Sequence, residues 1–192
     1  VYRDFMTVGL LLDQLKLKDP KAEDGKVMDD WIYIQERDVK IGRLQLFNNW
    51  SPYMVKDPDT VFMGLEYFCD EGDEMWNTPD QEFIDFAVGE LEKLGIVEKS
   101  YVKDAVLIRV PKAYPAYFGS YGQFDQIRNF TDSLENLFLV GRNGQHRYNN
   151  MDHSMLTAMA AADAILSGNA KDKTPVWDIN TEEEYHEEKE EA

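Results

Sequence analysis

The stretch from residue 136 to residue 168 constrains this chain most, because its pattern predicts a strand, a polar loop and a helix in direct succession. Residues 137–140 are a short apolar run, which is typical of a buried strand. The helix is predicted to begin near Asn150 or Asp152, since both residue types favour the N-cap position, and to end at Gly168. Its apolar residues follow helical spacing and are Met151, Met155, Ala158, Met159, Ala162, Ile165 and Leu166.

The loop and the helix start together form a candidate anion site. The first N–H groups of a helix have no partner within the helix, and its N-terminus carries a partial positive charge, which suits a phosphate group. Arg142 and Arg147 add two positive charges to the same loop. The alternative interpretation is an ordinary buried strand and core helix joined by a solvated loop.

The remaining chain predicts an α+β fold with a mixed, largely antiparallel sheet and side helices. Short polar links between strands favour antiparallel pairing. A helix is predicted after Thr78 and Pro79, ending at Gly95, and residues 117–134 are predicted to be largely helical. The predicted strands cover residues 6–15, 31–35, 40–47, 60–69 and 104–110, and a short helix is the alternative for residues 6–15.

Composition excludes several classes of protein. A formal net charge of −17 argues against nucleic acid as a partner. No stretch is long and apolar enough to predict a membrane span. Three histidines and one cysteine, Cys69, show no metal-ligand spacing, so no metal site is predicted. A single cysteine also fits a reducing compartment, and we expect a cytoplasmic location.

The loop carries a specific resemblance. Its pattern, Gly141-Arg142-x-Gly144-x-x-Arg147-Tyr148-x-x-Met151-Asp152, resembles the C-terminal flavin-binding segment of UDP-galactopyranose mutases. The preceding run from Asn136, Asn-Leu-Phe-Leu-Val-Gly, is similar to FAD-dependent amine oxidases and protoporphyrinogen oxidases. This resemblance implies that FAD is the cofactor of the whole protein. It also implies that the strand, loop and helix belong to a Rossmann-like FAD-binding domain.

The resemblance also implies roles for individual residues. The residues expected at the cofactor are Gly141, Arg142, Asn150, Met151 and Asp152. The residues expected at a small-molecule substrate, which could be a nucleotide sugar, are Tyr148, Tyr114, Arg3 and Arg147. His146 and His153 are candidates for acid–base work, and no residue is assigned as catalytic.

Three segments are expected to differ in role. Residues 1–134 resemble the substrate domain of this superfamily, residues 135–170 its return to the FAD-binding domain, and residues 171–192 read as a linker and an acidic tail. No Gly-x-Gly-x-x-Gly fingerprint for the ADP half of FAD is found. We therefore expect the chain to be the C-terminal part of a longer protein whose FAD-binding domain is its missing partner. The isolated chain should be inactive and should bind FAD weakly.

Three functions stay open at this point. The first is an FAD-dependent oxidoreductase in which the flavin accepts a hydride from a small substrate. The second is a mutase that isomerises a sugar nucleotide in envelope or lipopolysaccharide synthesis. Two residues depart from the mutase pattern, because Asn150 stands where an acid is usual and His146 where an aromatic residue is usual. The third is a non-catalytic binding module that has lost its flavin.

Overall fold

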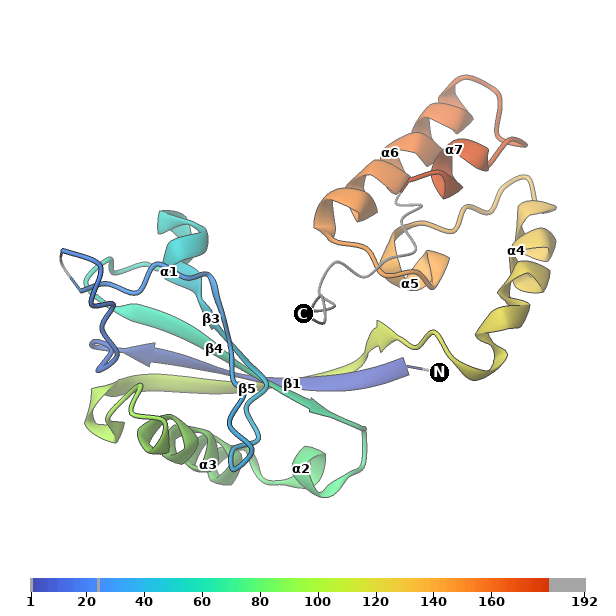
Figure 1. Cartoon of the computed structure of the whole chain (residues 1–192). Helices are drawn as coiled ribbons and strands as arrows, with labels where there is room; N and C mark the ends of the chain where they lie inside the picture. Colours follow the sequence, from blue (N-terminus) through green and yellow to red (C-terminus); the bar gives the residue numbers. More distant parts are fainter. Residues whose placement is uncertain (1, 24, 180–192) are drawn as a thin grey trace, which may run out of the picture. The chain divides into compact units, whose positions relative to one another are not determined.

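The chain divides into two compact units, which are described separately here (Figure 1). The computed structural model describes residues 2–23 and 25–179. The sheet unit covers Arg3–Ala113, and the helical unit covers Val1–Tyr2 and Tyr114–Ala192. The division falls at Ala113, earlier in the chain than residue 134, where the sequence suggested a change of role. Most of the predicted acidic tail lies outside the described residues.

The sheet unit is built on one sheet with five strands in the order β2-β3-β4-β1-β5. The pairs β2–β3, β3–β4 and β1–β4 are all antiparallel. The α+β fold with a largely antiparallel sheet is therefore as predicted. The strands are β1 (Tyr2–Leu12), β2 (Trp31–Tyr33), β3 (Arg43–Leu46), β4 (Val61–Cys69) and β5 (Val102–Pro115).

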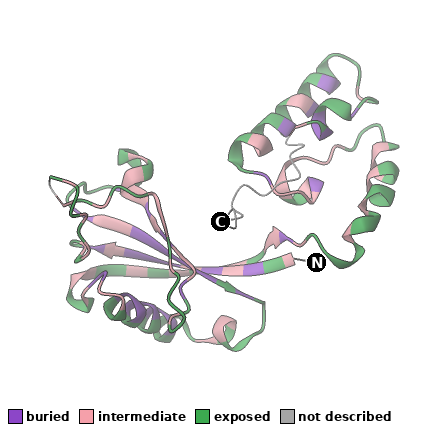
Figure 2. Cartoon of the chain, in the orientation of Figure 1, coloured by how far each residue is buried: buried purple, intermediate pink, exposed green. Residues whose placement is uncertain are grey.

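The core lies between one face of this sheet and helix α3 (Asp80–Lys93), and Figure 2 shows buried residues concentrated there. Alternate residues of a strand point to the same face, so β1 and β4 each supply every second residue to the core. The helix supplies Phe83, Ala87 and Leu91 at helical spacing. The largest fully buried strand residues are Met6, Leu10, Leu12, Leu44, Met63, Leu65 and Tyr67.

Helix α3 also fixes the loop before β3 through a buried carboxylate. Glu90 accepts hydrogen bonds from the backbone N–H groups of Lys40, at 2.5 Å, and Ile41, at 3.1 Å, and from the hydroxyl of Tyr67 at 3.1 Å. Burial and the neighbouring Glu90 carboxylate raise the pKa of Tyr67, which therefore stays a hydrogen-bond donor. Because these two backbone donors point to Glu90, β3 begins at Arg43 and is shorter than predicted.

The opposite face of the sheet carries aromatic rings over glycines. A Cβ atom at Gly64 would lie 3.0 Å from the ring of Phe47, in the short helix α1 (Phe47–Trp50). A Cβ atom at Gly42 would lie 2.8 Å from the ring of Phe68. Each ring thus occupies the volume that any other residue at the glycine would need. Beside them Arg43 pairs with the buried Glu66 at 2.6 Å.

A second buried carboxylate, that of Asp4 in β1, links this strand to β5 and to the loop that follows β4. Asp4 accepts hydrogen bonds from the backbone N–H groups of Lys112 and Glu71, each at 2.6 Å. These bonds hold the pKa of Asp4 below its ordinary value of 3.8. Lys112 has a φ of +56°, which residues with a side chain rarely adopt. Asp4 therefore stabilises an unfavourable backbone conformation within β5.

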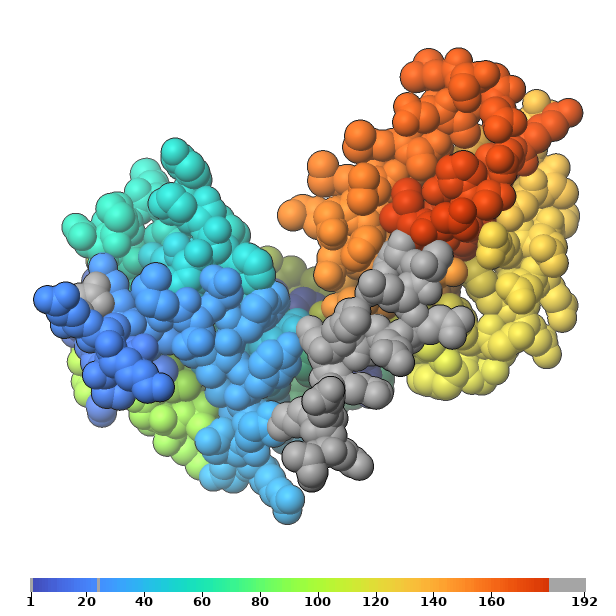
Figure 3. Space-filling model, turned by 45° about the horizontal axis from the view of Figure 1, so that its top comes forward, coloured from blue at the N-terminus to red at the C-terminus, as the bar shows by residue number. Residues whose placement is uncertain are grey.

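In the described part of the helical unit, four α-helices and one 3₁₀ helix surround a smaller core. They include η3 (Gly119–Gln123) and α4 (Phe124–Asp132), which agree with the predicted helical segment. In the space-filling view the α7 segment lies between α4 and α6 (Figure 3). The other helices are α5 (Gly141–Gln145), α6 (Met151–Leu166) and α7 (Thr174–Trp177), and α2 (Glu74–Asn77) belongs to the sheet unit. No helix of the described residues is long and apolar enough to cross a membrane.

Two predicted elements differ from the structure. The strand expected at residues 137–140 is wrong: these residues form no strand, and Leu137 is 38% exposed. The carbonyls of Leu134 and Leu137 instead accept hydrogen bonds from Lys173 Nζ. Backbone carbonyls at this segment therefore bond to a side chain and not to a neighbouring strand. The linker expected from residue 171 contains helix α7, in which Val176 and Trp177 are buried.

Candidate functional site

The predicted anion site begins at Gly141, whose backbone has a φ of +71°. Glycine adopts this conformation without steric cost, whereas other residues do not. The Gly141 N–H donates to Thr157 Oγ1 at 3.0 Å, and Thr157 lies fully buried in α6. The loop from residue 141 therefore starts at a fixed point on the helix that it leads into.

Helix α6 starts at Met151, as predicted, with Asn150 as its N-cap residue. The backbone N–H of Asn150 donates to His153 Nδ1 at 3.2 Å, and the Asn150 side chain accepts from the backbone of His153, so the two residues form a capping box. The acid–base role of His153 stays a prediction. Met151 is 80% exposed and Asn150 is exposed, so the helix start is open to solvent. Asp152, 70% exposed at its side chain, adds one negative charge there.

Arg142 contacts two other predicted residues, Tyr148 and Tyr114, and the backbone of Asn149. Its Nε donates to the carbonyl of Asn149 at 2.9 Å. Its guanidinium lies over the ring of Tyr148, 4.6 Å from the centroid, and over the ring of Tyr114 at 5.2 Å. Cation–π attraction of this kind orients a guanidinium without using its outer N–H donors. Arg142, Tyr148 and Tyr114 are thus brought together within the helical unit.

Tyr117 lies in the same electrostatic neighbourhood. Burial raises its pKa to about 12, and the nearby Tyr121 contributes in the same direction, while Arg142 lowers it. The hydroxyl of Tyr117 is therefore protonated at neutral pH and can donate a hydrogen bond.

His146 sits among aromatic rings instead of facing the helix start. Its ring centroid lies 5.1 Å from that of Tyr2, 5.7 Å from Tyr121 and 6.1 Å from Phe124. Its Nε2 is 3.3 Å from the carbonyl oxygen of Ala116. The backbone at His146 has a φ of +47°, so this ring packing stabilises a left-handed residue that ends α5.

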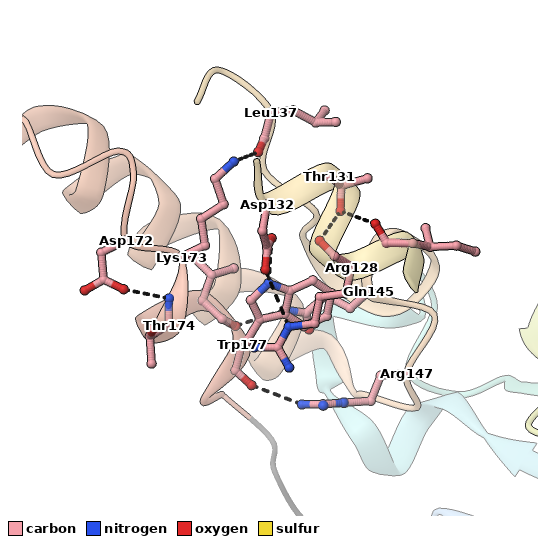
Figure 4. A network of polar contacts seen from close by, with 12 residues as sticks. Arg128, Thr131, Asp132, Leu137, Gln145, Arg147, Asp172, Lys173, Thr174 and Trp177 are labelled. Carbon is pink, nitrogen blue, oxygen red and sulfur yellow. Dashed lines mark hydrogen bonds and ion pairs between the residues drawn. The ribbon is translucent and has the colours of Figure 1, made fainter. Parts of the chain in front are cut away.

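Two predicted residues do not join this cluster. Arg147 extends toward α7, where its Nη1 donates to the carbonyl of Trp177 at 3.1 Å (Figure 4). Arg3 is an exposed residue of β1 in the sheet unit. The predicted roles of both residues at a substrate stay predictions.

Sequence reasoning missed the residues that hold the loop. Gln145 is 1% exposed and donates through Nε2 to the carbonyl of Val176 at 2.9 Å. Asn149 is 2% exposed and accepts through Oδ1 from the hydroxyl of Ser154 at 2.9 Å. No signal in one sequence separates buried amides from the many exposed Asn and Gln side chains, because both fit a polar loop equally well.

The donor set of the loop fits an anionic cofactor group. An open helix start and the Arg142 guanidinium supply N–H donors and positive charge. Two buried atoms of the same loop, Gln145 Oε1 and Asn149 Nδ2, have no hydrogen-bond partner among the described residues. Unsatisfied buried polar atoms are rare in native proteins and gather at functional sites. In the described part of the chain no group of three His, Cys, Asp or Glu residues could hold a metal ion.

Comparison with known proteins bears on the fold. No protein-family model and no curated protein matches the chain. Among solved structures, the crystal structure of reduced UDP-galactopyranose mutase superposes with a TM-score of 0.67 and 23% identity, over 93% of this chain. A putative protoporphyrinogen oxidase from Exiguobacterium sp. 255-15 superposes with a TM-score of 0.50 and 16% identity, over 69% of this chain.

These likenesses confirm the fold that the resemblance implied. This chain has the fold of a part of both proteins, because it covers 37% of the mutase chain and 27% of the oxidase chain. At such identities the likeness concerns the fold alone.

Proposed function

We propose that the chain is the C-terminal part of an FAD-dependent oxidoreductase of the amine-oxidase-like superfamily. The observation that supports this most is Arg142, whose guanidinium lies over the rings of Tyr148 and Tyr114 and whose Nε bonds to the carbonyl of Asn149, next to the N-cap residue of α6. A cation with outer N–H donors and a solvent-exposed helix start is suited to a flavin or its pyrophosphate.

Each residue would then have a definite task. Met151 and Asp152, in the first turn of α6, would present backbone N–H groups to FAD. Gly141 and Asn150, whose own N–H groups bond to Thr157 and His153, would fix the loop and the helix start against it. Arg142 would hold negative charge, while Tyr148 and Tyr114 would orient Arg142 and contact the substrate. The roles of Arg147 and Arg3 at a substrate stay predictions. When bound, the flavin would supply the redox chemistry by accepting a hydride.

The outer face of α6 supports a place in a larger protein. Met151, Met155 and Met159 are 80%, 61% and 59% exposed, and Ile165 and Leu166 are exposed beside them. Apolar residues gathered on one face of a helix mark an interaction surface. Residues 135–170 would pack by this face against an FAD-binding domain, residues 1–134 would form the substrate domain, and residues 171–192 would follow as linker and tail. A cytoplasmic location belongs to the same proposal.

The experiment uses the full-length parent protein. We expect a flavin absorbance spectrum from the purified protein. Arg142→Ala should weaken FAD binding about tenfold through loss of one charge-assisted contact. Arg142→Lys keeps the charge and should lose less. A colourless protein that takes up no added FAD would reject the proposal and favour the non-catalytic binding module.

A second candidate is a mutase acting on a nucleotide sugar. The observation that favours it is the pair of tyrosine rings near Arg142, whose hydroxyls together with Arg142 could hold a substrate diphosphate. Calorimetric titration of the flavin-loaded parent protein with UDP-galactose tests it. Saturable binding that Tyr148→Phe weakens would support the mutase, and no binding would leave the oxidoreductase as the remaining enzyme function.

A further inference from the structure

The helical unit contains a cavity of about 220 Å³ that none of Arg142, Tyr148 and Tyr114 lines. Residues of η3, α4 and α7 and the loop residue Arg147 line it. Three lining side chains are aromatic and three are charged: Tyr121, Phe124, Trp177, Arg128, Arg147 and Asp125. A volume below the usual range of about 300–1,000 Å³ for drug-sized ligands admits a single-ring molecule and excludes a dinucleotide.

The aromatic wall is fixed by its own contacts. Trp177 is 3% exposed, and its Nε1 donates to Asp132 Oδ1 at 3.1 Å (Figure 4). Its ring meets the ring of Phe124 edge-on, with centroids 6.1 Å apart. The rings of Tyr121 and Phe124 are stacked at 5.7 Å. These rings present apolar faces in a defined arrangement, which suits a flat ring.

The charged wall comes from two guanidinium groups. Arg128 lies over the Trp177 ring at 4.5 Å, and its Nε is 3.5 Å from Asp132 Oδ2. Its side chain is still 35% exposed. Arg147 donates to the Trp177 carbonyl from the other side. A guanidinium has five N–H donors in a planar fork that matches a carboxylate, and both groups are oriented before any ligand arrives.

A third feature limits the charge of the anion. Asp125, in the first turn of α4, is exposed and carries one negative charge. An anion with one charge can contact Arg128 and Arg147, whereas a second charge would meet Asp125.

From this arrangement we propose that the cavity is a binding site for a small aromatic monocarboxylate. Its carboxylate pairs with Arg128 and Arg147, and its ring lies against Phe124, Tyr121 and Trp177. The site is separate from the Arg142 cluster in the residues that form it. It therefore does not depend on whether the parent protein uses FAD.

The test is a titration of the 192-residue chain with benzoate, followed by two-dimensional ¹H–¹⁵N NMR. The indole N–H signal of Trp177 reports on the cavity directly, and Trp177→Phe assigns it by removing one of the four indole signals expected for four tryptophans. We expect benzoate to shift this signal saturably. Cyclohexanecarboxylate, with the same charge and no flat ring, and benzamide, with the ring and no charge, should each shift it with at least about tenfold weaker affinity.

Two variants of the cavity should change benzoate affinity in opposite directions. Arg128→Gln removes one guanidinium and should weaken binding about tenfold. Asp125→Asn removes the opposing charge at an exposed position and should strengthen binding about threefold. If Arg128→Gln also disturbs the position of Trp177, the affinity of Asp125→Asn for benzoate still tests the proposal. The proposal is overturned if benzoate leaves the Trp177 signal in place, if the three ligands bind alike, or if Asp125→Asn binds no tighter.

Discussion

At the scale of single residues, Gly141 and Gly89 provide a matched pair of substitutions. Gly141→Ala places a side chain at a φ of +71° and should lower the free energy of unfolding by about 1–2 kcal/mol. Gly89→Ala, at an exposed position in the middle of α3 with no atom within 4 Å of the new Cβ, should raise it by about 0.5–1 kcal/mol. Urea unfolding of both variants measures the difference. Equal effects would contradict the role assigned to the Gly141 backbone.

The carboxylate of Asp4 should make stability depend on pH. Its pKa in the folded chain lies below the ordinary value of 3.8, because the N–H groups of Lys112 and Glu71 bond to the charged form. Its contribution is therefore fully present above pH 3.8 and is lost as the pH falls through the folded pKa.

Urea titrations of the wild-type chain and Asp4→Asn between pH 7 and pH 2.5 measure this linkage. We expect the wild-type advantage to be constant near neutrality and to shrink in the acid range. A difference that does not change with pH would mean that Asp4 acts through shape alone. Lys112→Gly is a useful companion, because glycine relieves the φ of +56° that Asp4 stabilises.

At the scale of elements, the two faces of α6 should respond differently to substitution. Met155 and Met159 are exposed, so replacing both with Gln should change the free energy of unfolding by less than about 0.5 kcal/mol. The same change should reduce self-association of the isolated chain, because it removes apolar surface. Sedimentation velocity measures association.

Ala161 on the opposite face is the control, since it is only 6% exposed. Ala161→Leu forces extra volume into a packed site and should cost about 1–3 kcal/mol. If the Gln variants lose as much stability as Ala161→Leu, the exposed face of α6 is packed in solution.

Elements were predictable from sequence where local chemistry decides them. Alternating residues predicted β4, and Pro79 and Gly95 bracketed α3 correctly. The apolar run over residues 6–15 predicted a strand, but β1 begins and ends earlier, at Tyr2 and Leu12. Residues 137–140 failed because an apolar run becomes a strand only beside another strand, and that information is not local. Helix α7 was missed because its burial comes from partners such as Gln145 and Asp132, far away in the sequence.

At the scale of the molecule, the two units should differ in local stability. The buried hydrophobic cluster lies within the sheet unit, between Met6 and Val97. The buried apolar residues of the helical unit are fewer: Ala161, Ala164, Val176 and Trp177. Amide protection follows the density of buried contacts.

Hydrogen exchange followed by mass spectrometry should therefore show slow exchange in β1, β4 and α3 and faster exchange in α4 and α5. Trp177→Ala, which removes the largest buried side chain of the helical unit, should accelerate exchange in α4 and α7 while leaving β1 unchanged. Uniform acceleration over the whole chain would mean that the two units unfold as one.

Part of the candidate site could be predicted from the sequence. The resemblance led to Arg142, Tyr148 and Tyr114, and the structure brings Tyr114, which is 28 positions before Arg142 in the numbering, to the other two. Arg147 sits next to Tyr148 in sequence and yet donates to Trp177, because neighbouring side chains leave the backbone in different directions. Contacts of this kind need a fold and cannot be read from spacing.

The rings over Gly42 and Gly64 carry a consequence for how this sheet can evolve. The ring of Phe68 lies close to where a β-carbon at position 42 would stand, and the ring of Phe47 close to one at position 64. Substitutions at each glycine and its phenylalanine are therefore coupled. A side chain gained at position 64 would require the ring at position 47 to shift or to be replaced by a smaller residue. We expect related sequences to change these positions in pairs, with an alanine or serine at the glycine accompanied by a smaller partner.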